Sequence, residues 1–376
     1  MKRTHCPICG GDSVELAFPH PARSMLSDGR ILQRSLAKAS CLSCGAAYHA
    51  SGISGDEVRA IYDDEYALAR WSPKSDAQRA RTYRNWIRTE SAAPQNILEV
   101  GCGSGALLSE LLETWPEASG FGLDPALPEA ARSGGKIRLM RGFVEQIPQD
   151  GRRFDLIIAI NVIEHTAAPE MFLKALRAHL APDGQIVIIC PAAHPPNLEL
   201  LFFDHLYSLT SVALREASTA ASLAISKQTA APRDIGDFQM IILKPSPSAP
   251  IVSLATSPAS LHAARHDYLD RWARLDQTLL DRVAPGSRLL VFGGGQTAAL
   301  LRTYAPKTWS LAETIAVDDP SEAWTLGPAV VPYQDVRPRS GSTILIATSP
   351  HVQSAIAERL SRDGLRPITW NDLIPC

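Results

Sequence analysis

The chain has 376 residues, and its 37 basic and 39 acidic side chains give a net charge of −2 with histidine neutral. At about 150 residues per domain, this length predicts two or three domains. The near balance of charge argues against broad electrostatic binding of nucleic acid or anionic lipid. With 45% hydrophobic and 20% charged residues, the chain is predicted to fold as an ordinary globular protein rather than to remain disordered.

The apolar segments of the chain are all short. None approaches the ~20 residues that span a bilayer, and the first seven residues lack the apolar core of a signal peptide. We therefore expect a cytoplasmic protein with no membrane partner. Seven cysteines in a reducing compartment do not predict a disulfide framework, so their spacing becomes the informative quantity.

Four cysteines form two CxxC pairs, each followed by a glycine that lets backbone amides turn toward the thiolates. They are Cys6, Cys9, Cys41 and Cys44. Four sulfurs complete the tetrahedral shell that Zn²⁺ favours, so these residues predict a closed structural zinc site that folds its segment and does not catalyse. The alternative is two chance turns with buried thiols. Cys102, Cys190 and Cys376 show no such pairing.

Strands and helices are predicted to alternate regularly after Pro94, following a polar helical segment at about 54–88. The predicted strands are 96–100, 120–124, 137–142, 154–161 and 185–190, and the predicted helices are 105–114, 128–132 and 169–180. Regular alternation with nearly continuous apolar strands is typical of a parallel sheet covered by helices on both faces. We therefore predict a doubly wound α/β domain.

A second, smaller α/β series is predicted beyond the proline- and serine-rich stretch 245–250 and a helix at 258–283. Its strands are 288–292, 314–318 and 343–348, and its helices are 296–304 and 352–362. The series predicts a smaller C-terminal Rossmann-like domain. The expected organisation is a zinc-binding module at 1–53, a doubly wound domain with a helical lead-in at 54–250, and the C-terminal domain at 251–376.

A glycine-rich turn joins the first strand of the doubly wound domain to its first helix. Glu99 ends the strand, and Gly101, Gly103 and Gly105 follow. This segment resembles motif I of the class I methyltransferases that use S-adenosylmethionine (SAM). A glycine turn at a helix N-terminus offers amide donors to the carboxylate of the cofactor, although the turn alone is equally compatible with a dinucleotide.

An acid at the end of the second strand fits either cofactor, whereas Glu99 before the glycines and the two later segments favour SAM over a dinucleotide. Asp124 ends the second strand, where an acid meets ribose hydroxyls, and Phe143 follows the third strand. The segment 154–165 resembles the family pattern FDxI…N…EH, which contributes Asn161 and His165. The resemblance implies a cofactor site made of Glu99, Gly101, Gly103, Gly105, Asp124, Phe143 and Asn161.

The order of a four-cysteine zinc module, a SAM domain and a C-terminal Rossmann-like domain resembles that of the sugar C-methyltransferases, which act on nucleotide-linked deoxyketosugars. The resemblance extends over essentially the whole chain. In that family a Tyr-His-Glu-His segment after the fifth strand supplies the catalytic base, and this chain has Phe202, Phe203, Asp204 and His205. The final histidine and the acid are kept, whereas the two phenylalanines leave the identity of the sugar open.

The resemblance implies catalytic roles for His205, His165 and Asp204. Methylation of carbon requires removal of a proton next to a carbonyl, and imidazole titrates near the working pH. We expect His205 to be the base, and His165 to donate a hydrogen bond to the enolate oxygen or to substitute as the base.

Other functions remain open from the sequence. The substrate is expected to be a small molecule, either a nucleotide-linked ketosugar or a related metabolite, and the alternative is an O- or N-methyltransferase of another metabolite. An N-terminal zinc module with a SAM domain also occurs in enzymes that methylate ribosomal RNA, but the acidic balance and the extra C-terminal domain argue against RNA. A non-catalytic SAM-binding scaffold is disfavoured by the intact motif I. The glycines at 293–295 are expected to form a tight turn rather than a nucleotide site, because no fixed positive charge accompanies them.

Overall fold

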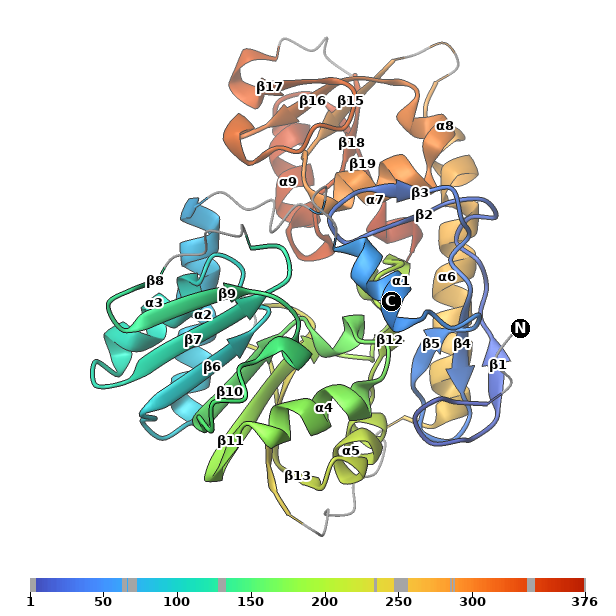
Figure 1. Cartoon of the computed structure of the whole chain (residues 1–376). Helices are drawn as coiled ribbons and strands as arrows, with labels where there is room; N and C mark the ends of the chain where they lie inside the picture. Colours follow the sequence, from blue (N-terminus) through green and yellow to red (C-terminus); the bar gives the residue numbers. More distant parts are fainter. Residues whose placement is uncertain are drawn as a thin grey trace. The chain divides into compact units, whose positions relative to one another are not determined.

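A computed structural model describes most of the chain, and Figure 1 draws its fold. The described residues are 5–62, 66, 73–127, 133–232, 235–246, 256–284, 286, 288–336 and 342–374. They form two compact units. Unit 1 comprises Met1–Glu15, Lys38–Glu199 and Asp204–His262, and unit 2 comprises Leu16–Ala37, Leu200–Phe203 and Ala263–Cys376.

Unit 1 is built on an eight-stranded sheet in the order β13-β14-β11-β10-β6-β7-β9-β8. Its five central strands run parallel to one another. They are β6 (Asn96–Val100), β7 (Ser119–Asp124), β9 (Ile137–Arg141), β10 (Phe154–Ile160) and β11 (Leu180–Pro191). These bounds confirm the predicted strands.

The two ends of this sheet depart from the parallel arrangement. At one end, β14 (Phe238–Pro245) pairs antiparallel with β11, and β13 (Leu223–Ala230) pairs antiparallel with β14. At the other end, β8 (Ser133–Gly134) pairs antiparallel with β9. The predicted strands include none of β13, β14 and β8. Antiparallel strands joined directly along the chain carry no crossover helix, so the alternation of strands and helices that predicted the central sheet stops here.

Both faces of the central sheet are buried. Ile158 of β10 belongs to a core cluster with Trp86 of α2 (Pro73–Glu90) and Leu108 of α3 (Ala106–Thr114). The next residue along β10, Ala159, points to the opposite face and is also fully buried. The helices α4 (Pro169–Ala178) and α5 (Ser211–Ala220) complete the main helices of the unit, and the short α1 (Gly55–Ile61) precedes α2. The helix predicted at 128–132 lies outside the described residues.

A second sheet in unit 1 joins the cysteine segments to the segment after β11. Its order is β1-β4-β5-β12, and all of its pairs are antiparallel. The strands are β1 (Ser13–Glu15), β4 (Lys38–Cys41), β5 (Ala47–His49) and β12 (Tyr207–Ser208). Because β12 supplies the edge strand, residues close to the predicted catalytic segment are held by the cysteine-bearing strands.

Unit 2 contains an all-parallel five-stranded sheet in the order β17-β16-β15-β18-β19. The second α/β series predicted three of these strands, β15, β16 and β18, and did not predict β17 or β19. Its strands are β15 (Leu289–Phe292), β16 (Ala312–Val317), β17 (Ala329–Pro332), β18 (Thr343–Ile346) and β19 (Arg366–Thr369). Its helices include α7 (Gln296–Tyr304), α8 (Pro306–Trp309) and α9 (Pro350–Arg362), and the long α6 (Pro258–Leu280) leads into it.

The predicted first domain, residues 1–53, is divided between the two units. Its cysteine pairs lie in unit 1, whereas the segment between them, with β2 (Ser24–Met25) and β3 (Ile31–Leu32), lies in unit 2. Met25 forms a bridge with Phe202, and Gln296 Nε2 donates to the Ser27 carbonyl over 3.0 Å. Met25 and Leu26 are buried there. A zinc module of about 50 residues has little core of its own, so this apolar segment finds its burial elsewhere.

Among the described residues, no helix combines the length and the apolar character needed to cross a membrane.

Candidate active site

The glycine turn after β6 has a backbone that favours glycine. Gly101, Gly103 and Gly105 have φ values of 76°, 52° and 81°, all in the left-handed region. A Cβ atom on Gly101 would lie 2.5 Å from Val162 Cγ2, and one on Gly105 would lie 3.0 Å from Leu139 Cδ1. A Cβ atom on Gly103 would meet nothing within 4 Å. The outer two glycines are therefore required by packing, whereas Gly103 presents bare backbone to open space.

Asp124, the acid at the end of β7, binds the glycine turn directly. Its Oδ2 accepts from the Gly103 amide over 3.0 Å, and its Oδ1 accepts from the Ala126 amide over 2.9 Å. Burial raises the pKa of Asp124, and the two amides oppose that rise. A carboxylate has about four lone-pair sites. Asp124 can thus fix the turn and still accept hydroxyl groups.

Glu99, at the end of β6, lies beneath this turn. It is 4% exposed, and its Oε2 has no hydrogen-bond partner within the described part of the chain. Burial raises the pKa of Glu99 well above its usual range, and the nearby Asp124 and Asp76 raise it further. The side chain of Asp76 accepts a hydrogen bond from Ser104 in the turn, over 2.5 Å.

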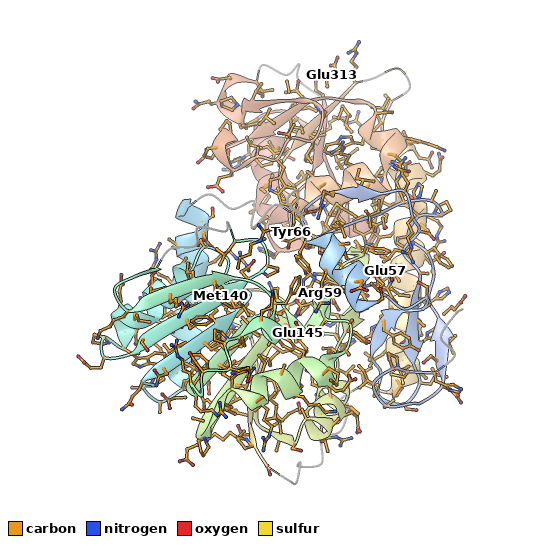
Figure 2. The ribbon with its side chains drawn as sticks, in the orientation of Figure 1. Glu57, Arg59, Tyr66, Met140, Glu145 and Glu313 are labelled. Carbon is orange, nitrogen blue, oxygen red and sulfur yellow. The ribbon has the colours of Figure 1, made fainter. Side chains whose placement is uncertain are left out.

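An aromatic group lies beside the predicted cofactor residue Phe143. The Tyr62 ring lies 6.2 Å from Phe143, 4.7 Å from Tyr66 and 6.4 Å from His165, measured between ring centroids. Burial raises the pKa of Tyr62, as do the nearby carboxylates, so its phenol stays protonated. Arg59 of α1 lies over the Phe143 ring and within 3.8 Å of Glu145. Figure 2 labels Arg59, Tyr66 and Glu145.

Two histidines with their own carboxylates form a buried cluster in unit 1. His165 Nδ1 lies 3.6 Å from Asp204 Oδ2, and His205 Nδ1 lies 3.7 Å from Glu199 Oε2. The two imidazole centroids are 4.6 Å apart. Burial lowers the pKa of both histidines, and His165 and Lys38 lower that of His205 further, while Asp204 raises both. Neutral rings with a carboxylate beside one nitrogen are suited to accepting a proton at the other nitrogen.

The cysteine-bearing strands support this cluster. Lys38, a buried residue of β4, donates through Nζ to the His205 carbonyl over 3.0 Å. Ser208 of β12 donates to Glu199 Oε1. Thr210 Oγ1 donates to the Cys44 carbonyl over 2.6 Å. The position of His205 and the orientation of Glu199 therefore depend on contacts with residues far away in the sequence.

Glu164 is the third acid of the cluster. It is 1% exposed, and both carboxylate oxygens lack a hydrogen-bond partner among the residues described. Burial raises the pKa of Glu164 well above its usual range, its own backbone amide opposes that rise, and Glu199 and Asp204 raise the pKa further.

The four cysteines of the two CxxC pairs converge. Cys6 Sγ lies 3.7 Å from Cys44 Sγ, Cys9 Sγ lies 3.5 Å from Cys41 Sγ, and all four sulfurs lie within 4.8 Å of one another. Tetrahedral zinc with Zn–S bonds of about 2.3 Å separates its sulfurs by about 3.8 Å. Amides of Ser43 and Cys44 point at Cys41 Sγ over 3.3 and 3.4 Å. The donor set and its geometry fit a structural zinc ion.

The structure brings the predicted catalytic residues His165, Asp204 and His205 together in one buried cluster. Asp204 accompanies His165, and the carboxylate beside His205 is Glu199, which the sequence analysis did not single out. Glu164 was visible only as part of the segment ending in His165. Phe202 and Phe203 belong to unit 2, whereas Asp204 and His205 belong to unit 1.

The remaining predicted site residues have well-defined surroundings. Asn161 has a positive φ of 54°, and its buried Oδ1 has no hydrogen-bond partner among the described residues. The hydroxyl of Tyr207, a phenol close to the predicted base in sequence, donates to the Ala167 carbonyl over 3.2 Å.

Comparisons with known proteins relate part of the chain to methyltransferases. A family model described as a methyltransferase domain matches residues 75–225. A ubiquinone biosynthesis O-methyltransferase of Azorhizobium caulinodans is 33% identical over 99 residues, which are 24% of this chain and 38% of that protein. A trans-aconitate 2-methyltransferase of Pseudomonas aeruginosa is 31% identical over 137 residues, which are 34% of this chain and 48% of that protein. The chain thus spans less than half the length of these curated relatives.

Solved structures of methyltransferases are also similar to this chain. One is the 1,6-didemethyltoxoflavin-N1-methyltransferase of Burkholderia thailandensis with bound S-adenosylhomocysteine (SAH), at 18% identity and a TM-score of 0.41. The match covers 56% of this chain and 96% of that one. The assignment rests on the family model and the curated relatives. The chain therefore carries an α/β, Rossmann-like domain of the class I SAM-dependent methyltransferases.

Proposed function

We propose that this protein transfers the methyl group of SAM to a small-molecule acceptor after a buried histidine has removed a proton from that acceptor. The observation that carries the proposal is the pair of imidazole–carboxylate contacts, at 3.6 and 3.7 Å, packed against each other in one buried cluster. A ring oriented by a carboxylate at Nδ1 presents Nε2 as the proton acceptor.

The glycine turn and Asp124 are the residues proposed to hold the cofactor. The bare backbone at Gly103 admits a ligand at close approach, and Asp124 accepts ribose hydroxyls while it holds the Gly103 amide. Bound SAM supplies an electrophilic methyl group. Phe143 and Asn161 are proposed to complete the pocket around it.

The four cysteines are proposed to hold a structural zinc ion, on the strength of their sulfur separations. The zinc fixes β4 and β5, and through Lys38 and β12 those strands hold the catalytic segment. The ion has no direct part in the chemistry, because four protein ligands leave it no open position.

His205 is proposed as the base, oriented by Glu199. The proton moves from the acceptor to Nε2 of His205, and the negative charge of Glu199 stabilises the imidazolium that results. His165, in its protonated form with Asp204 beside Nδ1, donates a hydrogen bond through Nε2 to the oxygen on which charge develops.

The acceptor atom is proposed to be a carbon next to a ketone, in a nucleotide-linked ketosugar or a related metabolite. The support is the resemblance to the sugar C-methyltransferases together with the two-histidine cluster, since a carbon acid needs both a base and an oxyanion donor. O-methylation is the second candidate, because both curated relatives described above bear the names of enzymes outside the sugar group and one is named an O-methyltransferase.

The test uses the full chain and SAM carrying a ¹³C-labelled methyl group. Nucleotide-linked 4-ketosugars form one acceptor panel, and phenols and carboxylic acids form the other. A labelled product whose methyl resonance is that of a C–CH₃ group supports the proposal, and an O–CH₃ resonance supports the second candidate. If SAH binds but neither panel is methylated, the proposed substrate class is wrong.

A further inference from the structure

We propose that Glu164, His165 and His205 form a binding site for one divalent transition-metal ion of the class of Zn²⁺ and Co²⁺, and that the bound ion inhibits methyl transfer. This site is separate from the four cysteines. The inhibition rests on the proposed function, whereas the binding of the ion does not.

The three side chains offer a recognised ligand set in a small volume. One ligand atom from each residue lies within 4.8 Å of the other two, and all three side chains are buried. Two imidazoles and one carboxylate are the protein ligands of many catalytic zinc sites. An ion with bonds of about 2.1 Å separates its tetrahedral ligands by about 3.4 Å, so closing on the ion takes only small side-chain rotations.

The surrounding carboxylates orient both rings for an ion. His165 turns Nδ1 toward Asp204, and His205 turns Nδ1 toward Glu199. Histidines that bind metals commonly donate their other ring N–H to a carboxylate, which fixes the tautomer and makes the binding nitrogen more basic. Here each Nδ1 lies near a carboxylate oxygen, at 3.6 and 3.7 Å, which is longer than a hydrogen bond. We take Nε2 of each ring as the proposed ligand atom, with Nδ1 facing its carboxylate.

Glu164 provides the independent observation that a ligand is missing. Both of its oxygens lie buried without a partner in the part of the chain that the structure describes. Burying an unsatisfied carboxyl group is costly, and a coordinated cation removes that cost. The carboxyl groups of Glu199 and Asp204 and the ammonium of Lys38 also act on this cluster, and the two carboxyl groups favour a bound cation.

Metal binding by His205 and its proposed action as a base are mutually exclusive. The lone pair on Nε2 of His205 can be given to a metal ion or to a proton, but not to both. Occupancy of this site therefore stops proton removal from the acceptor.

The binding test uses the full chain with its cysteine site loaded with Zn²⁺, and Co²⁺ as the probe. Equilibrium dialysis is expected to find one Co²⁺ per chain, with weak visible absorption and without the intense thiolate-to-cobalt bands that a cysteine site gives. Glu164→Gln and His165→Asn are each expected to weaken Co²⁺ binding by more than about tenfold. Glu113→Gln, at an exposed position of α3, is the matched control.

The outcomes separate the site from the function. Wild-type protein that takes up no Co²⁺ beyond its zinc, or Glu164→Gln protein that binds SAH and still takes up Co²⁺ like the wild type, overturns the site. SAH binding in each variant shows that the fold is intact. If Co²⁺ binds but one equivalent leaves methyl transfer unchanged, the proposed inhibition is wrong. If Co²⁺ binds and no acceptor is methylated even without it, the proposed function fails and the metal site stands.

Discussion

His165 and His205 meet edge to face, with ring centroids 4.6 Å apart and planes inclined by 73°. Asp204 Oδ2 lies 3.6 Å from Nδ1 of His165, and Glu199 Oε2 lies 3.7 Å from Nδ1 of His205. Because a positive charge on one ring disfavours a positive charge on the other, the cluster favours one protonated imidazole at a time. This relationship is consistent with the two proposed roles, in which His205 acts as the base and His165 donates a hydrogen bond.

Replacement of His205 tests the base. His205→Asn is expected to keep SAH binding and to lose methyl transfer by about a hundredfold or more, the usual scale for a positioned base. His165→Asn is expected to lose less, because its proposed role is to stabilise charge. Exchange of the acceptor C–H in deuterated water without SAM separates the two roles. Exchange and methylation at the native rate in His205→Asn would show that the base lies elsewhere.

Replacement of Glu199 tests which carboxylate serves the base. Glu199→Gln removes the negative charge beside His205 Nδ1 but keeps the acceptor for Ser208, so kcat is expected to fall by at least about tenfold with SAH affinity unchanged. Asp204→Asn is the matched variant, since it acts through His165, and a smaller fall is expected. Steady-state kinetics of both variants decides the assignment. A larger fall in kcat for Asp204→Asn than for Glu199→Gln would show that Asp204 is the carboxylate that supports the base.

Replacement of Asp124 tests the cofactor site. Asp124→Ala removes a charged acceptor and also releases the Gly103 amide, so SAH binding is expected to weaken by about 1.5–3 kcal/mol, roughly ten- to hundredfold. Titration calorimetry measures this change. Asp150→Ala, at an exposed position, is expected to bind SAH like the wild type. Equal SAH affinity in the two variants would show that Asp124 does not bind the ribose.

Two glycine variants separate packing from binding in the turn. Gly101→Ala forces a Cβ atom to within 2.5 Å of Val162, so overpacking of about 1–3 kcal/mol adds to the cost of the left-handed backbone. Gly103→Ala carries only the backbone cost, about 1–2 kcal/mol, yet its methyl group intrudes on the proposed cofactor site. We expect Gly101→Ala to have the lower Tm of the two variants. Gly103→Ala is expected to lose less stability but a larger share of its SAH affinity. Thermal unfolding with and without SAH checks both expectations, and identical behaviour of the two variants would contradict them.

Removal of zinc tests the cysteine site and its link to the cluster. Elemental analysis of protein purified without chelator is expected to find one zinc per chain, and none is expected in Cys41→Ser. Loss of the ion loosens β4 and β5, and with them Lys38 and β12, so methyl transfer is expected to fall even though no cysteine touches the acceptor. A zinc-free chain with native stability would show that the four thiols are merely packed together.

The sequence by itself determined the parts of this protein that depend on local geometry. The glycine turn at Gly101–Gly105 has the left-handed backbone that its composition predicted, because only glycine adopts those angles freely. The strands β6, β7, β9 and β10 were predicted to within one residue at each end, because strands buried on both faces of a parallel sheet are continuously apolar. The strand β11 begins at Leu180, before its predicted start at 185. The CxxC spacing predicted the convergence of four sulfurs, because each pair forms a compact turn.

Only the tertiary structure decided which side chains meet across long separations. Asp204 adjoins His205 in sequence yet lies beside His165, since the directions of neighbouring side chains are set by the packing of their loop. Glu199 reaches His205 because β12 and Ser208 hold it there. Segment 16–37 separates from its flanking cysteines because its apolar side chains are buried in unit 2. Such contacts depend on how elements distant in sequence pack together, and a local pattern of residues carries no information about that packing.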